Sequence, residues 1–257
     1  GACAATGKNL KSKCTGYALQ KKCKIRAETV QNLCKISAKG KMMILVVGHT
    51  KGGVGKSLLA VNLAVAAARH GRKVLLVDGD HQATAAGFTA LRAQNGIADY
   101  TAVVLIGTAI RTQVRLLAPN YRHVIIDCGG QETVAFRAAL TVADKLLVPV
   151  PPRTWEFWAT QQLLPIIVEA QEINPQLRAY SVLNAADASG TDNDEVAKLL
   201  RGFEPTLTYL DTPLVRRKVW SDAVARGLAV HEYKPRNSKA VSELVALYKT
   251  IFRKKEN

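Results

Sequence analysis

The sequence predicts an α/β protein in which a doubly wound, mostly parallel sheet carries helices on both faces. Two observations lead to this fold class. Apolar runs of four to six residues recur along the chain without alternating polar residues, which is typical of strands buried on both faces. Longer segments with helical spacing separate these runs, and crossover helices between strands imply a parallel sheet.

The individual elements follow in order along the chain. The predicted strands cover residues 43–47, 73–77, 123–126, 145–150 and 179–183. The predicted helices cover residues 57–70, 131–143 and 155–173, and a last apolar stripe at helical spacing lies in residues 240–255. Gly71 and Pro175 stand at two helix ends as stop signals. Ligands bind beyond the carboxyl ends of such strands, so we expect function just after Val47, Val77 and Ile126.

The composition is that of an ordinary globular protein, and its net charge favours an anionic partner. The chain has 257 residues, of which 48% are hydrophobic and 22% charged. Its apolar runs are shorter than the roughly 18 residues needed to cross a bilayer, so a membrane-spanning protein is not expected. The net charge of +16 favours nucleic acid, an acidic lipid surface or a phosphorylated ligand as partner.

The charge and the cysteines are concentrated at the start of the chain. Residues 1–41 hold ten of the 36 basic residues, only one acidic residue and four of the five cysteines, at spacings unlike those of zinc sites. We interpret this segment as a basic leader that is disordered or not native, with a DNA-binding or metal-binding arm as the alternative. Residues 42–257 form the predicted functional domain. A single cysteine in that domain, Cys128, favours a reducing cytoplasm.

A glycine-rich loop between the first strand and the first helix predicts a phosphate site. Gly52, Gly53 and Gly55 let main-chain N–H groups turn toward phosphate oxygens, next to the positive end of a helix dipole. Lys56 supplies a charge for the β- and γ-phosphates, and the Ser57 hydroxyl is placed to bind Mg²⁺. The alternative is a glycine-rich turn that only links strand to helix.

The loop carries an additional lysine, Lys51. The pattern Lys-Gly-Gly-x-Gly-Lys-Ser that it begins resembles the deviant Walker A motif of the ParA/MinD family of ATPases, which partition plasmids and chromosomes or position other cargo. The resemblance implies the P-loop NTPase fold, ATP and Mg²⁺ as cofactors, and a homodimer on ATP in which Lys51 reaches the partner subunit's nucleotide. An added lysine beside a phosphate cradle is costly unless it meets another anion, so the residues themselves also favour a second phosphate nearby.

Two aspartate motifs follow the next strands. The segment from Asp78 to Gln82 resembles the family's Asp-x-Asp-Pro-Gln switch, with His81 in place of proline. The resemblance implies that Asp80 activates the attacking water and lies near Mg²⁺; the alternative is that the two aspartates only cap the following helix. Asp127 ends a buried apolar strand and resembles the Walker B aspartate, which holds Mg²⁺.

Outside these three motifs, the sequence offers few further candidates for the site. Asn184 ends an apparent strand where relatives often contact the base, and a loop-capping role is the alternative. Cys128 is interpreted as a packed thiol, since an iron–sulfur cluster of the related nitrogenase iron protein needs two cysteines per subunit. The catalytic residues expected are Lys51, Lys56 and Asp80, and the metal ligands are Ser57, Asp80 and Asp127. The residues expected to contact the nucleotide are Gly52, Gly53, Val54, Gly55, Lys56, Ser57, Leu58 and Asn184.

Basic residues near the C-terminal end predict a DNA-binding surface. The residues expected to bind DNA are Arg216, Arg217, Lys218, Lys234 and Arg236. Such phosphate contacts carry no sequence code and weaken steeply with salt; the alternative is a solvated basic surface. The stripe in residues 240–255 is interpreted as a terminal helix packed on the domain, and membrane binding is not expected.

These features together favour a short ParA-like partition ATPase. It would dimerise on ATP, bind DNA nonspecifically, be released on hydrolysis stimulated by a ParB-like adaptor or cargo protein, and so segregate a plasmid, chromosome or other cargo. A cytoplasmic, nucleoid-associated protein is expected. Two alternatives stay open: a MinD-like membrane-associated regulator of cell division, and a biosynthetic P-loop enzyme of the same superfamily.

Overall fold

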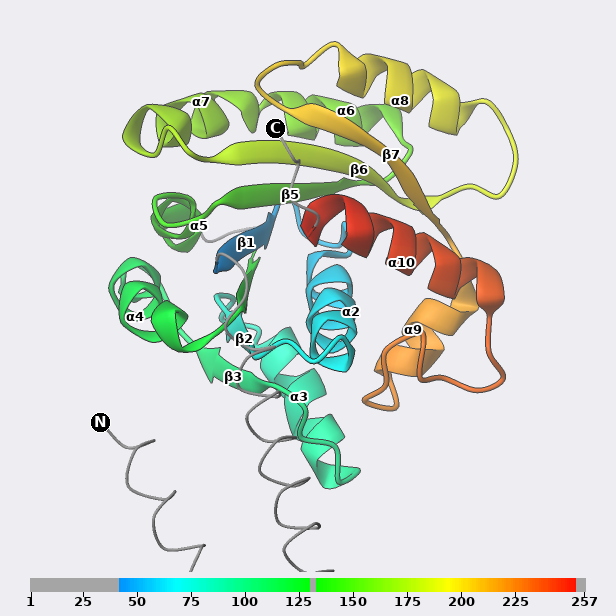
Figure 1. Ribbon diagram of the computed structural model, residues 1–257. Coiled ribbons are helices and arrows are strands. Elements are labelled where there is room, and N and C mark those ends of the chain that lie inside the picture. The colour runs from blue at the N-terminus through cyan, green and yellow to red at the C-terminus, as the bar shows by residue number, and fades with distance from the viewer. Residues whose placement is uncertain (1–41, 130–132, 253–257) are drawn as a thin grey trace, which may run out of the picture. The chain divides into compact units, whose positions relative to one another are not determined.

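The computed structural model describes residues 42–129 and 133–252, which form an α/β domain around a seven-stranded parallel sheet (Figure 1). The strands are β1 (Met43–Gly48), β2 (Val74–Asp78), β3 (Thr101–Val104), β4 (His123–Cys128), β5 (Lys145–Val150), β6 (Arg178–Ala186) and β7 (Thr208–Val215). Their order across the sheet is β3-β2-β4-β1-β5-β6-β7, and every neighbouring pair is parallel. The predicted fold class is confirmed.

Helices cover both faces of this sheet. They are α2 (Lys56–Arg69), α3 (Thr84–Gln94), α4 (Ala109–Leu117), α5 (Thr133–Leu140), α6 (Thr154–Gln161), α7 (Leu164–Ile173), α8 (Asp192–Arg201), α9 (Lys218–Val224) and α10 (Ser238–Phe252), with a 3₁₀ turn at Ala118–Asn120. One apolar core lies under α4, α5, α7 and α8, and a second lies under α2, α3, α9 and α10. Figure 1 shows these two helical layers on opposite sides of the sheet.

The central strands are the most completely buried. All six residues of β4 and all five of β2 are buried, whereas the edge strand β3 is partly exposed. This agrees with the sequence, in which the central runs are continuously apolar. The sheet contains two strands that the sequence prediction omits, β3 and β7. β3 is a four-residue exposed edge, and β7 contains Pro213, which weakens its strand pattern.

The predicted helix over residues 155–173 is wrong as a single element. The chain forms α6 up to Gln161 and begins α7 at Leu164. Pro165 explains the break, because proline has no N–H to donate within a helix and is tolerated in the first turn, where α7 has it.

The predicted final stripe is confirmed as a packed helix within the described residues. Val241, Leu244, Leu247, Tyr248 and Ile251 of α10 are all buried, and the last four belong to the second core. Across the part of the chain that the structure describes, no helix combines the length and apolar character that a bilayer crossing requires. The predicted leader, residues 1–41, and its four cysteines lie outside the described residues, as do residues 253–255 of the predicted stripe.

Candidate nucleotide-binding site

Three strand ends meet at one edge of the sheet. β1 lies between β4 and β5, and its last residue, Gly48, is paired with Cys128 of β4. Asp78, which ends β2, is paired with Asp127 of β4. Because all strands run in the same direction, the loop after β1, the segment after β2 and Asp127 lie together. The structure therefore brings together the three segments that the sequence singles out.

The glycine-rich loop wraps into the first turn of α2. Gly55 precedes this helix with φ 91°, a left-handed conformation that favours glycine. A Cβ atom at Gly55 would also lie 2.2 Å from Nδ2 of Asn184, so only glycine fits here. Asn184 in turn donates from Nδ2 to the carbonyl of Val54 at 2.7 Å. Asn184 thus reaches from β6 to support the loop, and this strand continues to Ala186, three residues beyond the predicted end at residue 183.

Lys56 is folded back onto the same loop. Its ammonium donates to the carbonyl of Lys51 at 2.6 Å, and only 6% of the residue is exposed. Burial lowers the pKa of Lys56, while Asp127 and Asp80 act in the opposite direction. An incoming phosphate would favour the charged form of this lysine by the same electrostatic effect.

An open cavity of about 680 Å³ lies over the loop. Its lining comes from the glycine-rich loop, the first turn of α2 and the segment after β2: Gly52, Gly53, Gly55, Lys56, Ser57, Leu58, Asp80, His81, Gln82 and Thr84. This volume lies within the range of about 300–1,000 Å³ that is usual for small-molecule sites. Two of the predicted nucleotide contacts, Val54 of the loop and Asn184 of β6, are buried and are not part of this lining.

The two aspartates of the segment after β2 have different surroundings. Asp78 is 1% exposed and accepts the main-chain N–H groups of Asp80 and of Ala86, which lies in the first turn of α3. Of the two aspartates, only Asp78 is thus seen to bind this helix end, as the capping alternative has it for both; Asp80 accepts the N–H of Gln82, before α3. Asp80 borders the cavity, and a Cβ atom at Gly129 would lie 2.6 Å from its carboxylate. The glycine after β4 therefore lets Asp80 approach the end of that strand closely.

Asp127 is a buried carboxylate. Neither of its oxygens has a hydrogen-bond partner among the described residues, and the residue is 1% exposed. Burial raises its pKa to about 7, which the nearby Ser57 hydroxyl and Lys56 ammonium counteract only in part. A divalent cation beside Ser57 would relieve this, so the residues present fit Mg²⁺. Within the described ranges no group of three or more His, Cys, Asp or Glu side chains could hold a metal by itself, so phosphate oxygens and water would complete the coordination.

Two further residues of this edge lie outside the predicted set. His49 directly follows β1 and is 1% exposed; its Nδ1 accepts the N–H of Lys51 at 3.0 Å. Its Nε2 lies 3.2 Å from the hydroxyl of Thr160 on α6. The only local signal for His49 is a polar residue immediately after a buried strand, and nothing in the sequence indicates Thr160.

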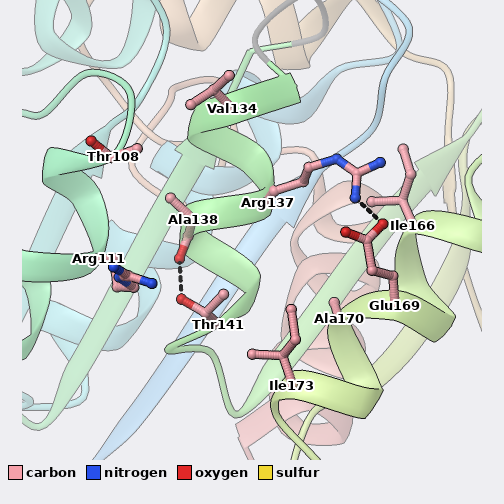
Figure 2. Close-up of a pocket in the computed structure, with 10 residues that line it drawn as sticks. All are labelled: Thr108, Arg111, Val134, Arg137, Ala138, Thr141, Ile166, Glu169, Ala170 and Ile173. Atoms are coloured by element: carbon pink, nitrogen blue, oxygen red, sulfur yellow. Dashed lines mark hydrogen bonds and ion pairs between the residues drawn. The ribbon is translucent and has the colours of Figure 1, made fainter.

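A second cavity of about 280 Å³ lies between α4, α5 and α7 (Figure 2). Arg137 of α5 and Glu169 of α7 form an ion pair across it, and exposed Val134 and Ile173 contribute apolar surface. Its lining includes neither the glycine-rich loop nor any of the predicted site residues, so the cavity over the loop is the candidate nucleotide site.

The predicted DNA-binding residues differ in their availability. Arg216, Lys218, Lys234 and Arg236 are exposed. Arg217 is instead held against α10, where it donates to the Glu243 carboxylate at 2.6 Å. The exposed residues lie just after β7, at the start of α9 and in the segment before α10.

Comparison with known proteins decides the family. The model of the CobQ/CobB/MinD/ParA nucleotide binding domain matches residues 45–230, well over half of the chain. The chain belongs to this family. The resemblance in the loop motif is thereby confirmed.

Individual proteins that resemble the chain include carboxysome distribution and chromosome partitioning proteins. The maintenance of carboxysome distribution protein A of Halothiobacillus neapolitanus is 28% identical over 213 residues, covering 80% of this chain and 95% of the relative. The chromosome partitioning protein ParA of Caulobacter vibrioides is 26% identical over 235 residues, covering 75% and 87%. A Cyanothece McdA in complex with ATP has the same fold, with a TM-score of 0.69 at 15% identity, over 84% of this chain and 98% of that one.

Proposed function

We propose that the chain is a Mg²⁺-dependent ATPase of the positioning type, which dimerises on ATP, binds DNA nonspecifically and is released by hydrolysis. The observation that carries this function is the additional Lys51 in a phosphate loop whose other lysine, Lys56, donates to the Lys51 carbonyl at 2.6 Å. Two lysines at one cradle are stable together when two sets of phosphates are present. A dimer with two nucleotides supplies them.

Within each subunit the described residues divide the chemistry. Lys56 and the loop N–H groups would hold the phosphates, and Ser57 with Asp127 would hold Mg²⁺, which offsets charge on the transferred phosphoryl group when bound. Asp80 borders the same cavity and would orient the attacking water. Asn184 supports the loop through Val54, and we propose that its amide oxygen contacts adenine.

Relatives and surface charge support the cellular role. The two relatives named above are a carboxysome distribution protein and a chromosome partitioning protein. For this chain we propose that an adaptor, ParB-like or a cargo protein, stimulates hydrolysis. Four exposed basic residues near α9 and α10 would contact DNA phosphates, and dimerisation would double them. We place the protein in the cytoplasm, at the nucleoid. The MinD-like alternative loses its main support, because the apolar stripe of α10 is buried in the domain.

A DNA-retention assay tests this function. The protein is applied to immobilised nonspecific DNA with ATP, ADP or no nucleotide, at two salt concentrations. We expect retention with ATP only and a steep loss at the higher salt. Lys56→Ala should abolish it, and Arg236→Ala should weaken it, whereas Lys198→Ala, which removes an exposed lysine on α8, should not. Retention that does not depend on the nucleotide would contradict the function.

A further inference from the structure

His49 and Thr160 connect the phosphate loop to a helix that lies far away in the sequence. His49 stands between β1 and the loop, while Thr160 belongs to α6, which follows β5. Both residues are almost fully buried, with 1% and 0% exposed. A buried polar pair of this kind is retained only where its hydrogen bonds are satisfied, so both ring nitrogens of His49 need a partner. The structure gives each of them one.

The hydrogen bonds fix the state of the imidazole. Nδ1 accepts the main-chain N–H of Lys51 at 3.0 Å, so it carries no proton. The proton of the neutral ring is therefore on Nε2, which donates to the Thr160 hydroxyl at 3.2 Å. Burial and the two loop lysines lower the pKa of His49 to about 4, so the ring stays neutral at physiological pH.

The same contacts hold the main chain of Lys51 from both sides. Its N–H is bound by His49, and its carbonyl accepts the Lys56 ammonium at 2.6 Å. The next residues, Gly52 and Gly53, are exposed, and a Cβ atom at either would meet nothing within 4 Å. The main chain is therefore fixed at Lys51 by hydrogen bonds, and the two glycines that follow it are exposed beside the cavity.

We propose that His49 is a positioning residue, which Thr160 locks in one tautomer and which sets the direction in which Lys51 leaves the loop. This role rests on the proposed function, in which Lys51 acts on the partner subunit's nucleotide. His49 itself touches neither nucleotide. Its loss would leave the cradle of its own subunit largely intact and would weaken the step that needs Lys51, the association of two subunits.

The test compares nucleotide binding with dimerisation in the same variants. ADP affinity reports the cradle within one subunit, and the dimer dissociation constant with ATP and Mg²⁺, from analytical ultracentrifugation, reports the action of Lys51. For His49→Ala we expect a dimer at least tenfold weaker and an ADP affinity within threefold of wild type. His49→Asn should restore most of the dimer, because an asparagine oxygen also accepts the N–H two residues on. Thr160→Val, which keeps the shape of the side chain, should weaken the dimer about threefold.

Controls separate this role from the proposed function and from misfolding. Asn184→Leu removes the other support of the loop, at Val54, and should reduce ADP affinity as well as dimerisation. If Lys51→Ala dimerises like wild type, the proposed function fails. If Lys51→Ala loses the dimer while His49→Ala and Thr160→Val both keep it, the positioning role is overturned. Should His49→Ala fail to fold, Thr160→Val and His49→Asn decide the matter by the same two measurements.

Discussion

Arg92 of α3 should be a principal support of the segment that carries the proposed DNA-binding residues. Its guanidinium is 1% exposed and donates to Glu232 at 2.6 Å, to Asp99 at 2.7 Å and to the carbonyl of Gly227 at 2.9 Å. Burial alone would raise the pKa of Glu232, but the hydrogen bonds from Arg92 and from the N–H of Ala229, together with the charge of Arg92, lower it overall. The perturbation that tests this network is Arg92→Met, which keeps the volume and removes the charge.

The expected loss follows from the burial of the partners. Removing one member of a buried ion pair costs about 3–5 kcal/mol, since it leaves the other charge uncompensated. Glu232 and Asp99 keep 14% and 29% of their side chains exposed, which places Arg92→Met near the lower end. For a domain of this size, about 3 kcal/mol corresponds to a fall in melting temperature of about 6–12 °C.

Thermal unfolding measures this loss, and an arginine on the opposite face supplies the control. Arg137 also pairs with a glutamate, Glu169, but both side chains are about half exposed, at 44% and 53%. Such a pair contributes about 0–1 kcal/mol, so Arg137→Met should barely lower the melting temperature. DNA retention with ATP should fall in Arg92→Met at temperatures where the variant is folded. An equal, small effect in the two variants would refute the reasoning from burial.

Three more outcomes are expected. Gly129→Ala should retain nucleotide but slow hydrolysis at least tenfold, because its Cβ atom would displace the Asp80 carboxylate; phosphate release measures this, and wild-type turnover would contradict it. Asp127→Asn should abolish the Mg²⁺ dependence of ATP binding in a calorimetric titration, and a retained dependence would mean that the ion is held elsewhere. The pKa of buried His123 is lowered to about 4 by burial and two nearby arginines, so stability is lost as pH falls from about 6.5 toward 4. His123→Phe should therefore reduce the loss between pH 7.5 and pH 5 by about 2 kcal/mol in urea titrations, and an unchanged loss would show that this histidine does not titrate with unfolding.

The sequence predicts those parts of the protein that are encoded locally. The phosphate loop is readable because glycines, Lys56 and the start of α2 follow one another directly, and the buried strands are readable because they are continuously apolar. β3 escapes prediction because an exposed edge strand of four residues lacks that signal. Pro165 signals the break before α7, but the helical spacing of apolar residues over 155–173 favours one continuous helix, which the structure does not form.

The supports of the site could not be predicted, because they join residues that are far apart in the chain. Asn184 reaches Val54 across 130 positions, and His49 reaches Thr160 across 111. The sequence identifies Asn184 as a site residue but offers no way to see that its amide holds the loop. Only the order of the strands, with β5 and β6 beyond β1, brings these side chains behind the phosphate loop.

Arg217 illustrates the corresponding limit for charge patterns. In the sequence it stands between Arg216 and Lys218 and has equal standing with them as a DNA-binding residue. In the fold its side chain is 19% exposed and paired with Glu243, whose carboxylate also accepts the N–H of Val215. The pair therefore fixes α10 to the end of β7, and its charge is already balanced. Nonspecific DNA binding depends on cations that can replace counterions at phosphates, so it is the exposed neighbours of Arg217, and not the run as a whole, that should set the salt dependence.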